Sequence, residues 1–202
     1  MPDEVETPPH ATLTKAARRL RWLLPLFGGS LATFTLLDRL GLGDPVQAPH
    51  GAMAAVQAVA LVLLASGFLC VVISAMWLHA ASAMLATRGA AMRHSPTGAW
   101  GWYFLPVANL LMPFRAMQEI WRNGVGITEP LLVRWWSAWI VGNIAMSAAA
   151  RFDTMGGIDN GLGVAFDTVG VAALFVAGLC FARIVARVTQ ALTGQAQTAT
   201  FA

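Results

Sequence analysis

The chain is dominated by long apolar blocks that are separated by short polar stretches, and the blocks lack the strict alternation of a transmembrane strand. A helix is the expected element for such a block, because it satisfies its own backbone hydrogen bonds where no water is present. The blocks predict spans at about residues 20–40, 52–80, 131–150 and 164–188. The pattern therefore predicts an all-α membrane protein with four transmembrane helices in a bundle.

The two ends of the chain are polar and predict tails. Residues 1–14 are acidic and contain prolines, which is typical of a disordered N-terminal tail. Residues 189–202 are uncharged and rich in Gln, Thr and Ala, which is typical of a frayed C-terminal tail. We therefore expect the helical membrane domain at residues 15–188.

Residues 98–123 do not follow the simple pattern of a span. Pro106 and Pro113 each remove a backbone donor, and Asn109 adds an amide that needs partners. From Pro113 onward, apolar residues fall on one helical face and charged residues on the others. The pattern favours a proline-kinked, amphipathic segment that is interfacial or re-entrant. The alternative is a kinked fifth span inside the bundle.

The basic residues distinguish these two topologies, because Lys and Arg are retained on the cytoplasmic side. Four spans place all but two of the 13 basic residues on that side, the exceptions being Arg39 and Arg151. Five spans would divide them almost equally between the two sides. The distribution favours four spans with a cytoplasmic N-terminus.

Composition narrows the function classes. Hydrophobic residues make up 57% of the chain and charged residues 11%, which excludes an ordinary soluble domain. The net charge of +3 comes from arginines near the apolar blocks and indicates membrane orientation, with no nucleic-acid partner expected. The expected partners are the lipid bilayer and either a second copy of the chain or another membrane protein.

The sequence lacks the usual catalytic and metal-binding motifs. It has no GxSxG elbow and no HExxH pair, and Asp167 is the only acidic residue close to a membrane interior. Cys70 and Cys180 lie in apolar blocks, where a thiol acts as a small hydrophobe. We expect no enzymatic activity, no cofactor and no metal.

Two small-residue patterns favour close helix packing in a compact bundle or a dimer. They are Ala138-xxx-Gly142 and Ala173-xxx-Ala177. Between them in sequence, Asn143 lies midway along an apolar block. We expect its amide to hydrogen-bond a neighbouring helix.

A set of aromatic, proline and charged residues between positions 77 and 139 has a specific order and spacing. The set comprises Trp77, Ser95, Pro96, Trp102, Pro106, Asn109, Pro113, Arg115, Glu119, Trp121, Trp135 and Trp136. It resembles a bacterial multi-pass membrane protein family catalogued as domain of unknown function 4328. The resemblance implies a multi-pass protein of the inner membrane and supplies no activity, substrate or cofactor.

The chain departs from the family pattern shortly after Trp77. Ala80 and Met84 stand where an arginine and an asparagine are common. Any role of those polar residues is therefore not expected here.

Together these observations predict a non-enzymatic interaction or scaffold protein of the bacterial inner membrane. Its cytoplasmic segment, residues 95–134, would form an amphipathic platform for a partner or for lipid headgroups. The alternative is a small transporter or channel subunit that uses a helix broken at Pro106 and Pro113.

Overall fold

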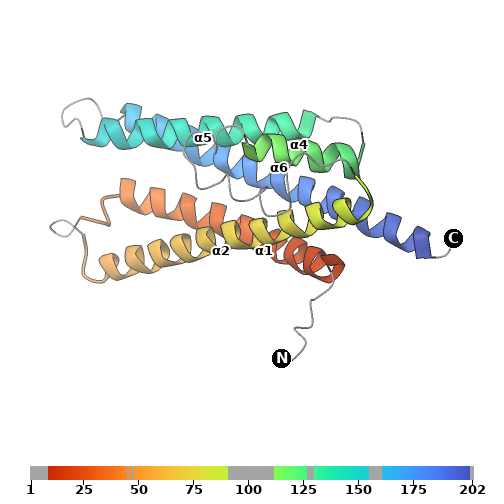
Figure 1. Ribbon diagram of the computed structural model, residues 1–202. Helices are drawn as coiled ribbons and strands as arrows, with labels where there is room; N and C mark the ends of the chain where they lie inside the picture. The colour runs from red at the N-terminus through yellow and green to blue at the C-terminus, as the bar shows by residue number, and fades with distance from the viewer. Residues whose placement is uncertain are drawn as a thin grey trace. The chain divides into compact units, whose positions relative to one another are not determined.

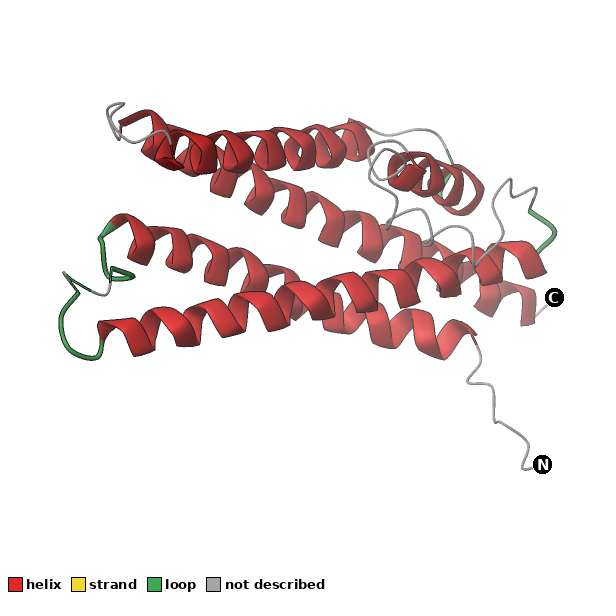
Figure 2. Ribbon diagram, turned by 60° about the vertical axis from the view of Figure 1, so that its left-hand side comes forward, coloured by secondary structure: helices red, strands yellow, loops and turns green. Residues whose placement is uncertain are grey.

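The architecture is known from a computed structural model that describes residues 9–44, 46, 48–90, 112–126, 130–154 and 161–200. Every regular element within these ranges is a helix (Figures 1 and 2). The helices are α1 (Pro9–Arg39), α2 (Ala52–Thr87), α4 (Met112–Gly124), α5 (Pro130–Thr154) and α6 (Gly161–Thr200). The all-α prediction is confirmed.

Three helices are long and apolar enough to cross a membrane, namely α1, α2 and α6. They contain 31, 36 and 40 residues. About 20 residues are enough for one crossing. The chain is therefore membrane-associated, and α1, α2 and α6 each extend well beyond the length that a bilayer requires. α5 is less apolar, and its role as a fourth span stays a prediction.

Helix extends into both regions that were predicted to be tails. α1 begins at Pro9, and Leu13 in its first turns is fully buried, so residues 9–14 belong to the helix. α6 continues to Thr200, and its Leu192 is also fully buried. The predicted boundaries at residues 14 and 188 were wrong because hydropathy detects lipid contact and misses polar helices that pack on protein.

The chain divides into two compact units. Unit 1 consists of Met1–Arg21, Val71–Leu132 and Ala182–Ala202, and unit 2 consists of Trp22–Cys70 and Val133–Phe181. Long helices contribute to both units, and each unit is described by itself below.

Unit 1 contains the fully buried core. The largest side chains that are less than 2% exposed all belong to it. They are Leu13, Leu20, Trp77, Leu78, Leu85, Met117, Ile120, Trp121, Leu132, Ile184, Val188 and Leu192. Unit 1 is thus packed in the way a water-soluble domain is packed.

Unit 2 has the opposite distribution. It holds most of the large apolar side chains that are exposed, among them Trp22, Leu61, Leu64, Phe68 and Ile144. Its helices contact one another through small residues: the Ser30 and Ser66 hydroxyl oxygens lie 3.5 Å apart, and a Cβ at Gly67 would lie 3.1 Å from the Phe27 ring. Small residues that allow close approach, together with apolar residues turned outward, are typical of a membrane-embedded bundle.

Candidate functional site

The short helix α4 packs its apolar face into unit 1. Met117 and Ile120 are fully inaccessible and Trp121 is 1% exposed, whereas Arg115 and Arg122 are exposed. These apolar side chains are buried in protein, and the exposed surface of α4 is polar. The interfacial position of the segment stays a prediction.

Two side chains of α2 hydrogen-bond the C-terminal part of α6 within unit 1. The indole Nε1 of Trp77 donates to the hydroxyl oxygen of Thr189 at 3.0 Å. Eleven residues further along α2, the Arg88 guanidinium donates to the backbone carbonyl of Leu192 at 2.6 Å. These bonds attach the part of α6 that the sequence predicted to be a frayed tail.

The contact at Leu192 also involves α4. A Cβ at Gly124 would lie 3.4 Å from Leu192 Cδ2, so the glycine near the end of α4 sits directly against this side chain. Helices α2, α4 and α6 therefore converge on one turn of α6. The family-motif residues Trp77, Pro113 and Trp121 are all buried in this unit.

One hydroxyl in unit 1 has no partner within the described residues. Ser82 on α2 is fully buried, and its Oγ makes no hydrogen bond there. A buried hydroxyl without a partner carries a cost of about 1–3 kcal/mol. We assign it no role.

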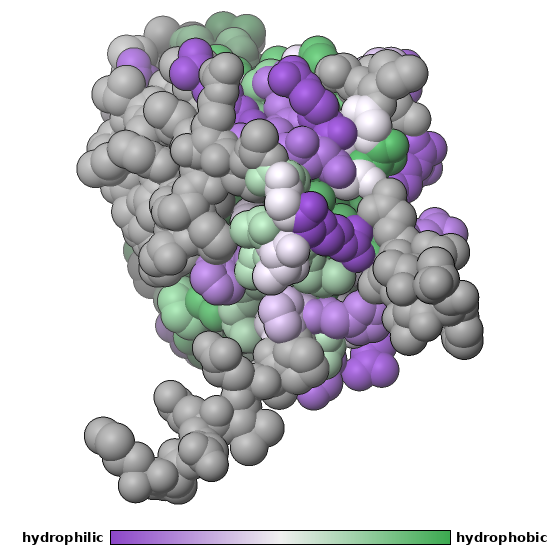
Figure 3. Space-filling view, turned by 45° about the vertical axis from the view of Figure 1, so that its right-hand side comes forward, coloured by the Kyte–Doolittle hydropathy of each residue, from purple (hydrophilic) through white to green (hydrophobic). Residues whose placement is uncertain are grey.

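The exposed charge of unit 1 is strongly basic. Among its described residues the only acidic side chain is Glu119, and every basic side chain is exposed. These are Lys15, Arg18, Arg19, Arg21, Arg88, Arg115, Arg122, Arg183 and Arg187. Figure 3 shows hydrophilic residues spread over the coloured part of the face that it presents.

Unit 2 contains an ion pair between helices α1 and α6. Arg39 Nε donates to Asp167 Oδ2 at 2.6 Å, and Arg39 Nη2 contacts the same oxygen. Asp167 is buried, and the Arg39 side chain is largely covered. The pair satisfies the single buried carboxylate described in this unit, which argues for a structural role.

Tryptophans at the start of α5 form an aromatic cluster in unit 2. Trp136 stacks on Trp139 with ring centroids 4.8 Å apart, and Trp135 stacks on Phe181 of α6 at 5.5 Å. Both family-motif tryptophans, Trp135 and Trp136, are therefore mostly buried. The contact between Trp135 and Phe181 packs α5 against α6.

Further along, α5 and α6 approach backbone to backbone. A Cβ at Gly142 would lie 2.6 Å from Leu174 Cγ and 3.1 Å from the Leu174 backbone nitrogen. One helical turn away, a Cβ at Gly170 would lie 2.7 Å from Met146 Sδ and 3.1 Å from the Met146 nitrogen. Each glycine accommodates a larger residue of the other helix, so the small-residue spacing predicted at Gly142 does mark a close contact.

Within the described residues of the chain, the Asn143 amide does not hydrogen-bond a neighbouring helix, so that prediction was wrong. Its Nδ2 donates to the carbonyl of Trp139 in the same helix at 2.7 Å, and the side chain is exposed. The neighbouring Gly142 faces α6, and adjacent helical positions point in different directions. Asn143 consequently faces away from the bundle.

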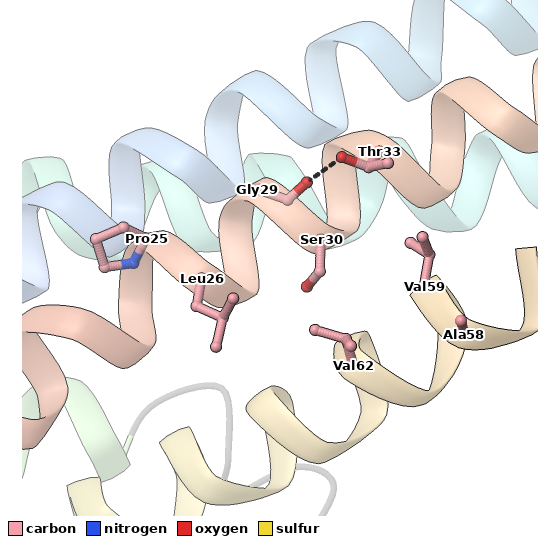
Figure 4. A pocket seen from close by; sticks show the side chains of 8 residues that line it. All are labelled: Pro25, Leu26, Gly29, Ser30, Thr33, Ala58, Val59 and Val62. Atoms are coloured by element: carbon pink, nitrogen blue, oxygen red, sulfur yellow. Dashed lines mark hydrogen bonds between the residues drawn. The ribbon is translucent and has the colours of Figure 1, made fainter. Parts of the chain in front are cut away.

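A shallow groove of about 450 Å³ lies between α1 and α2 in unit 2 (Figure 4). Its lining is largely apolar and consists of Pro25, Leu26, Gly29, Ser30, Thr33, Ala58, Val59 and Val62. The Thr33 hydroxyl is already bonded to the Gly29 carbonyl at 2.9 Å. The groove offers no charged group to a ligand. The transporter alternative stays a prediction, since Pro106 lies outside the described residues.

The predicted motif residues separate into three groups. Trp77, Pro113, Trp121, Trp135 and Trp136 are buried and pack helices together. Arg115 is exposed and Glu119 is half-buried on α4. The remaining ones lie outside the described residues; they are Ser95, Pro96, Trp102, Pro106 and Asn109.

Sequence reasoning missed several residues that join helices. Thr189, Arg88 and the Arg39–Asp167 pair were not singled out as contacts. For the ion pair a signal existed. Arg39 and Asp167 carry opposite charges, and the four-span topology places them at the same side of the membrane. For Thr189 there was none, because it lies beyond the last apolar block.

No group that could hold a metal or form a disulfide stands out in the described part of the chain. Within those residues, no three His, Cys, Asp or Glu side chains are grouped as a metal site requires. Cys70 and Cys180 are both free thiols. The candidate functional features of the described residues are therefore their packing, their surface charge and the contacts between helices.

The fold and these features define an all-helical, membrane-associated protein. The family model described as Domain of unknown function (DUF4328) matches residues 44–193. The chain belongs to this family, as the motif spacing indicated. No curated protein and no solved structure matches the chain.

Proposed function

We propose that this chain is a non-enzymatic, multi-pass protein of the bacterial inner membrane, in which unit 2 is embedded in the bilayer and unit 1 is a cytoplasmic module that binds a partner. The observation that carries the proposal is the contrast between the two surfaces. Unit 2 turns most of the exposed large apolar side chains outward, whereas unit 1 buries most of its large apolar side chains and turns its basic ones outward. Lipid suits the first surface and water suits the second.

The lengths of the unit 2 segments support four crossings. α1, α2, α5 and α6 contribute residues 22–39, 52–70, 133–154 and 161–181, which are 18, 19, 22 and 21 residues long. At about 1.5 Å per residue each segment is about 27–33 Å long, close to the hydrocarbon thickness of about 30 Å. This agreement supports α5 as the fourth span despite its lower hydropathy.

The charge of unit 1 supports its cytoplasmic location. Nine of the 13 basic residues of the chain lie among its described residues, against Arg39, Arg134 and Arg151 in unit 2. Basic residues next to spans are retained in the cytoplasm. The N-terminus belongs to unit 1 and would share that side.

Helix α4 is the best-defined binding surface of the proposed module. Its apolar face is packed in the core of unit 1. The helix is therefore already formed, and its exposed face can bind a partner without a folding step. Arg115 and Arg122 are exposed two turns apart on that face, with Gln118 between them. Two guanidinium groups at this spacing suit an acidic segment of a partner protein.

Charge reversal on α4 tests the proposal. Native membranes that contain the tagged chain are cross-linked, solubilised and purified, and the captured proteins are identified by mass spectrometry. We expect a partner that is captured by the wild type and lost with Arg115→Glu/Arg122→Glu. Arg151→Glu is the matched control, because Arg151 is exposed in unit 2 and would lie on the other side of the membrane.

The variants must reach the membrane in equal amounts, which immunoblotting and size-exclusion chromatography establish. Loss of the partner with the α4 variant and its retention with the Arg151 variant would support a cytoplasmic platform on α4. An identical set of captured proteins for all three chains would contradict it.

A further inference from the structure

Asn143 occupies an unusual place on α5. It lies at the centre of residues 133–154, the segment that α5 contributes to unit 2, and its side chain is exposed. Exposed apolar residues stand next to it, with Ile144 63% and Val141 48% accessible. If α5 spans the bilayer as proposed above, this carboxamide lies at mid-membrane and faces outward.

The amide is only partly satisfied. A carboxamide offers two N–H donors and one oxygen acceptor. Within the described residues Asn143 makes one hydrogen bond, from Nδ2 to the Trp139 carbonyl at 2.7 Å. Its other donor and its acceptor have no water to bind at that depth, and exposing them to hydrocarbon is unfavourable.

Two exposed hydroxyl side chains in the middle parts of unit 2 helices do not share this problem. Ser147 donates to the Asn143 carbonyl and Thr168 donates to the Val164 carbonyl, each at 2.8 Å. A hydroxyl has one donor, which these bonds use within the same helix. Asn143, at the centre of its segment, therefore keeps polar atoms that call for a partner outside its own helix.

We infer that α5 is the contact surface between two copies of this chain, with the Asn143 amides of both copies hydrogen-bonded to each other. A carboxamide is self-complementary, because its donor can meet the acceptor of an identical group across a two-fold axis. Ile144, the next residue on α5, adds exposed apolar surface beside it that the second copy covers. The inference rests on the proposed four-span topology.

The experiment is disulfide cross-linking in native membranes, in a chain that carries Cys70→Ala and Cys180→Ala. Ile144→Cys is expected to form a covalent dimer on mild oxidation. Leu64→Cys on α2 is the matched control, because Leu64 is 69% exposed in the same unit but lies on another helix. It should give only background cross-linking.

Variants at position 143 then test the amide itself. Adding Asn143→Leu to Ile144→Cys should reduce the dimer about fivefold to tenfold, because the interhelical hydrogen bonds are lost. Asn143→Gln keeps the carboxamide and should retain most of the dimer. Thr168→Val should have no effect, since it removes a hydroxyl that is already bonded within α6.

The outcomes separate this inference from the topology on which it rests. A membrane-impermeant maleimide should not label Ile144→Cys in spheroplasts or in inverted vesicles, and labelling from either side would overturn both the fourth span and the dimer. If Ile144→Cys is not labelled from either side, the fourth span is supported. Three results would then overturn the dimer alone: no covalent dimer, a dimer that Asn143→Leu does not reduce, or a cross-link to a protein of different mass.

Discussion

The glycines that let α5 and α6 approach each other should be intolerant of even one added methyl group. At Gly142 the new Cβ would lie 2.6 Å from Leu174 Cγ and 3.1 Å from the Leu174 backbone nitrogen. The leucine side chain could rotate away, but the backbone nitrogen could not, so Gly142→Ala must push the helices apart. Gly170→Ala meets Met146 in the same way.

The expected magnitude follows from two opposing effects. Overpacking a well-packed contact costs about 1–3 kcal/mol, whereas replacing glycine by alanine inside a helix gains up to about 1 kcal/mol. Gly142→Ala should therefore lower the free energy of unfolding by about 1–2 kcal/mol. Gly178→Ala on α6 should be neutral or stabilising, because nothing lies within 4 Å of a Cβ at that position.

The assay is thermal unfolding of the purified chain in one detergent, followed by size-exclusion chromatography of the heated samples. Gly142→Ala is expected to unfold at a clearly lower temperature than Gly178→Ala. Adding Leu174→Ala to Gly142→Ala should recover only part of the loss, since the backbone nitrogen stays in place. Equal stability of Gly142→Ala and Gly178→Ala would refute the close approach of these helices.

Three further predictions concern the ion pair, the buried tryptophan and cofactors. Asp167→Asn should lower the free energy of unfolding by about 1–3 kcal/mol, because the covered Arg39 guanidinium loses its carboxylate. The exchange Arg39→Asp/Asp167→Arg should recover part of this loss. No recovery in thermal unfolding would count against a specific pair. Thr189→Val should cost about 1 kcal/mol by removing the hydrogen bond, and Trp77→Phe should cost more because the smaller ring also leaves buried space unfilled. The double variant should cost no more than Trp77→Phe alone, because both changes remove the same hydrogen bond; additive losses would show that it is not shared. Purified protein should contain no stoichiometric metal and no haem by elemental analysis and absorption spectroscopy, and one equivalent of either would contradict this.

The helical class could be predicted from the sequence because long apolar blocks leave few alternatives in a bilayer. The blocks near α1, α2 and α6 correspond to the three helices that are long and apolar enough to cross. The start of α4 near Pro113 could also be predicted, since proline is favoured in the first turn of a helix. These features depend on local sequence, which a single chain displays directly.

The long helix extensions and the contacts between helices could not be predicted in the same way. Trp77 and Thr189 are 112 residues apart, and Arg39 and Asp167 are 128 residues apart, so no local pattern links them. Hydropathy indicates where lipid contacts a helix, but Leu192 is buried by protein in a stretch that is polar overall. The outward direction of Asn143 depends on the packing of Gly142 against α6, which spacing alone does not fix.

The topology of the chain is the central claim, and cysteine accessibility tests it most directly. In a cysteine-free background, Asn123→Cys on α4 and Val46→Cys between α1 and α2 are each exposed to a membrane-impermeant maleimide applied to intact spheroplasts. Four spans with a cytoplasmic unit 1 predict labelling at position 46 and protection at position 123 until the membrane is permeabilised. Labelling at position 123 in intact spheroplasts, together with a C-terminal tag accessible from outside, would contradict the account.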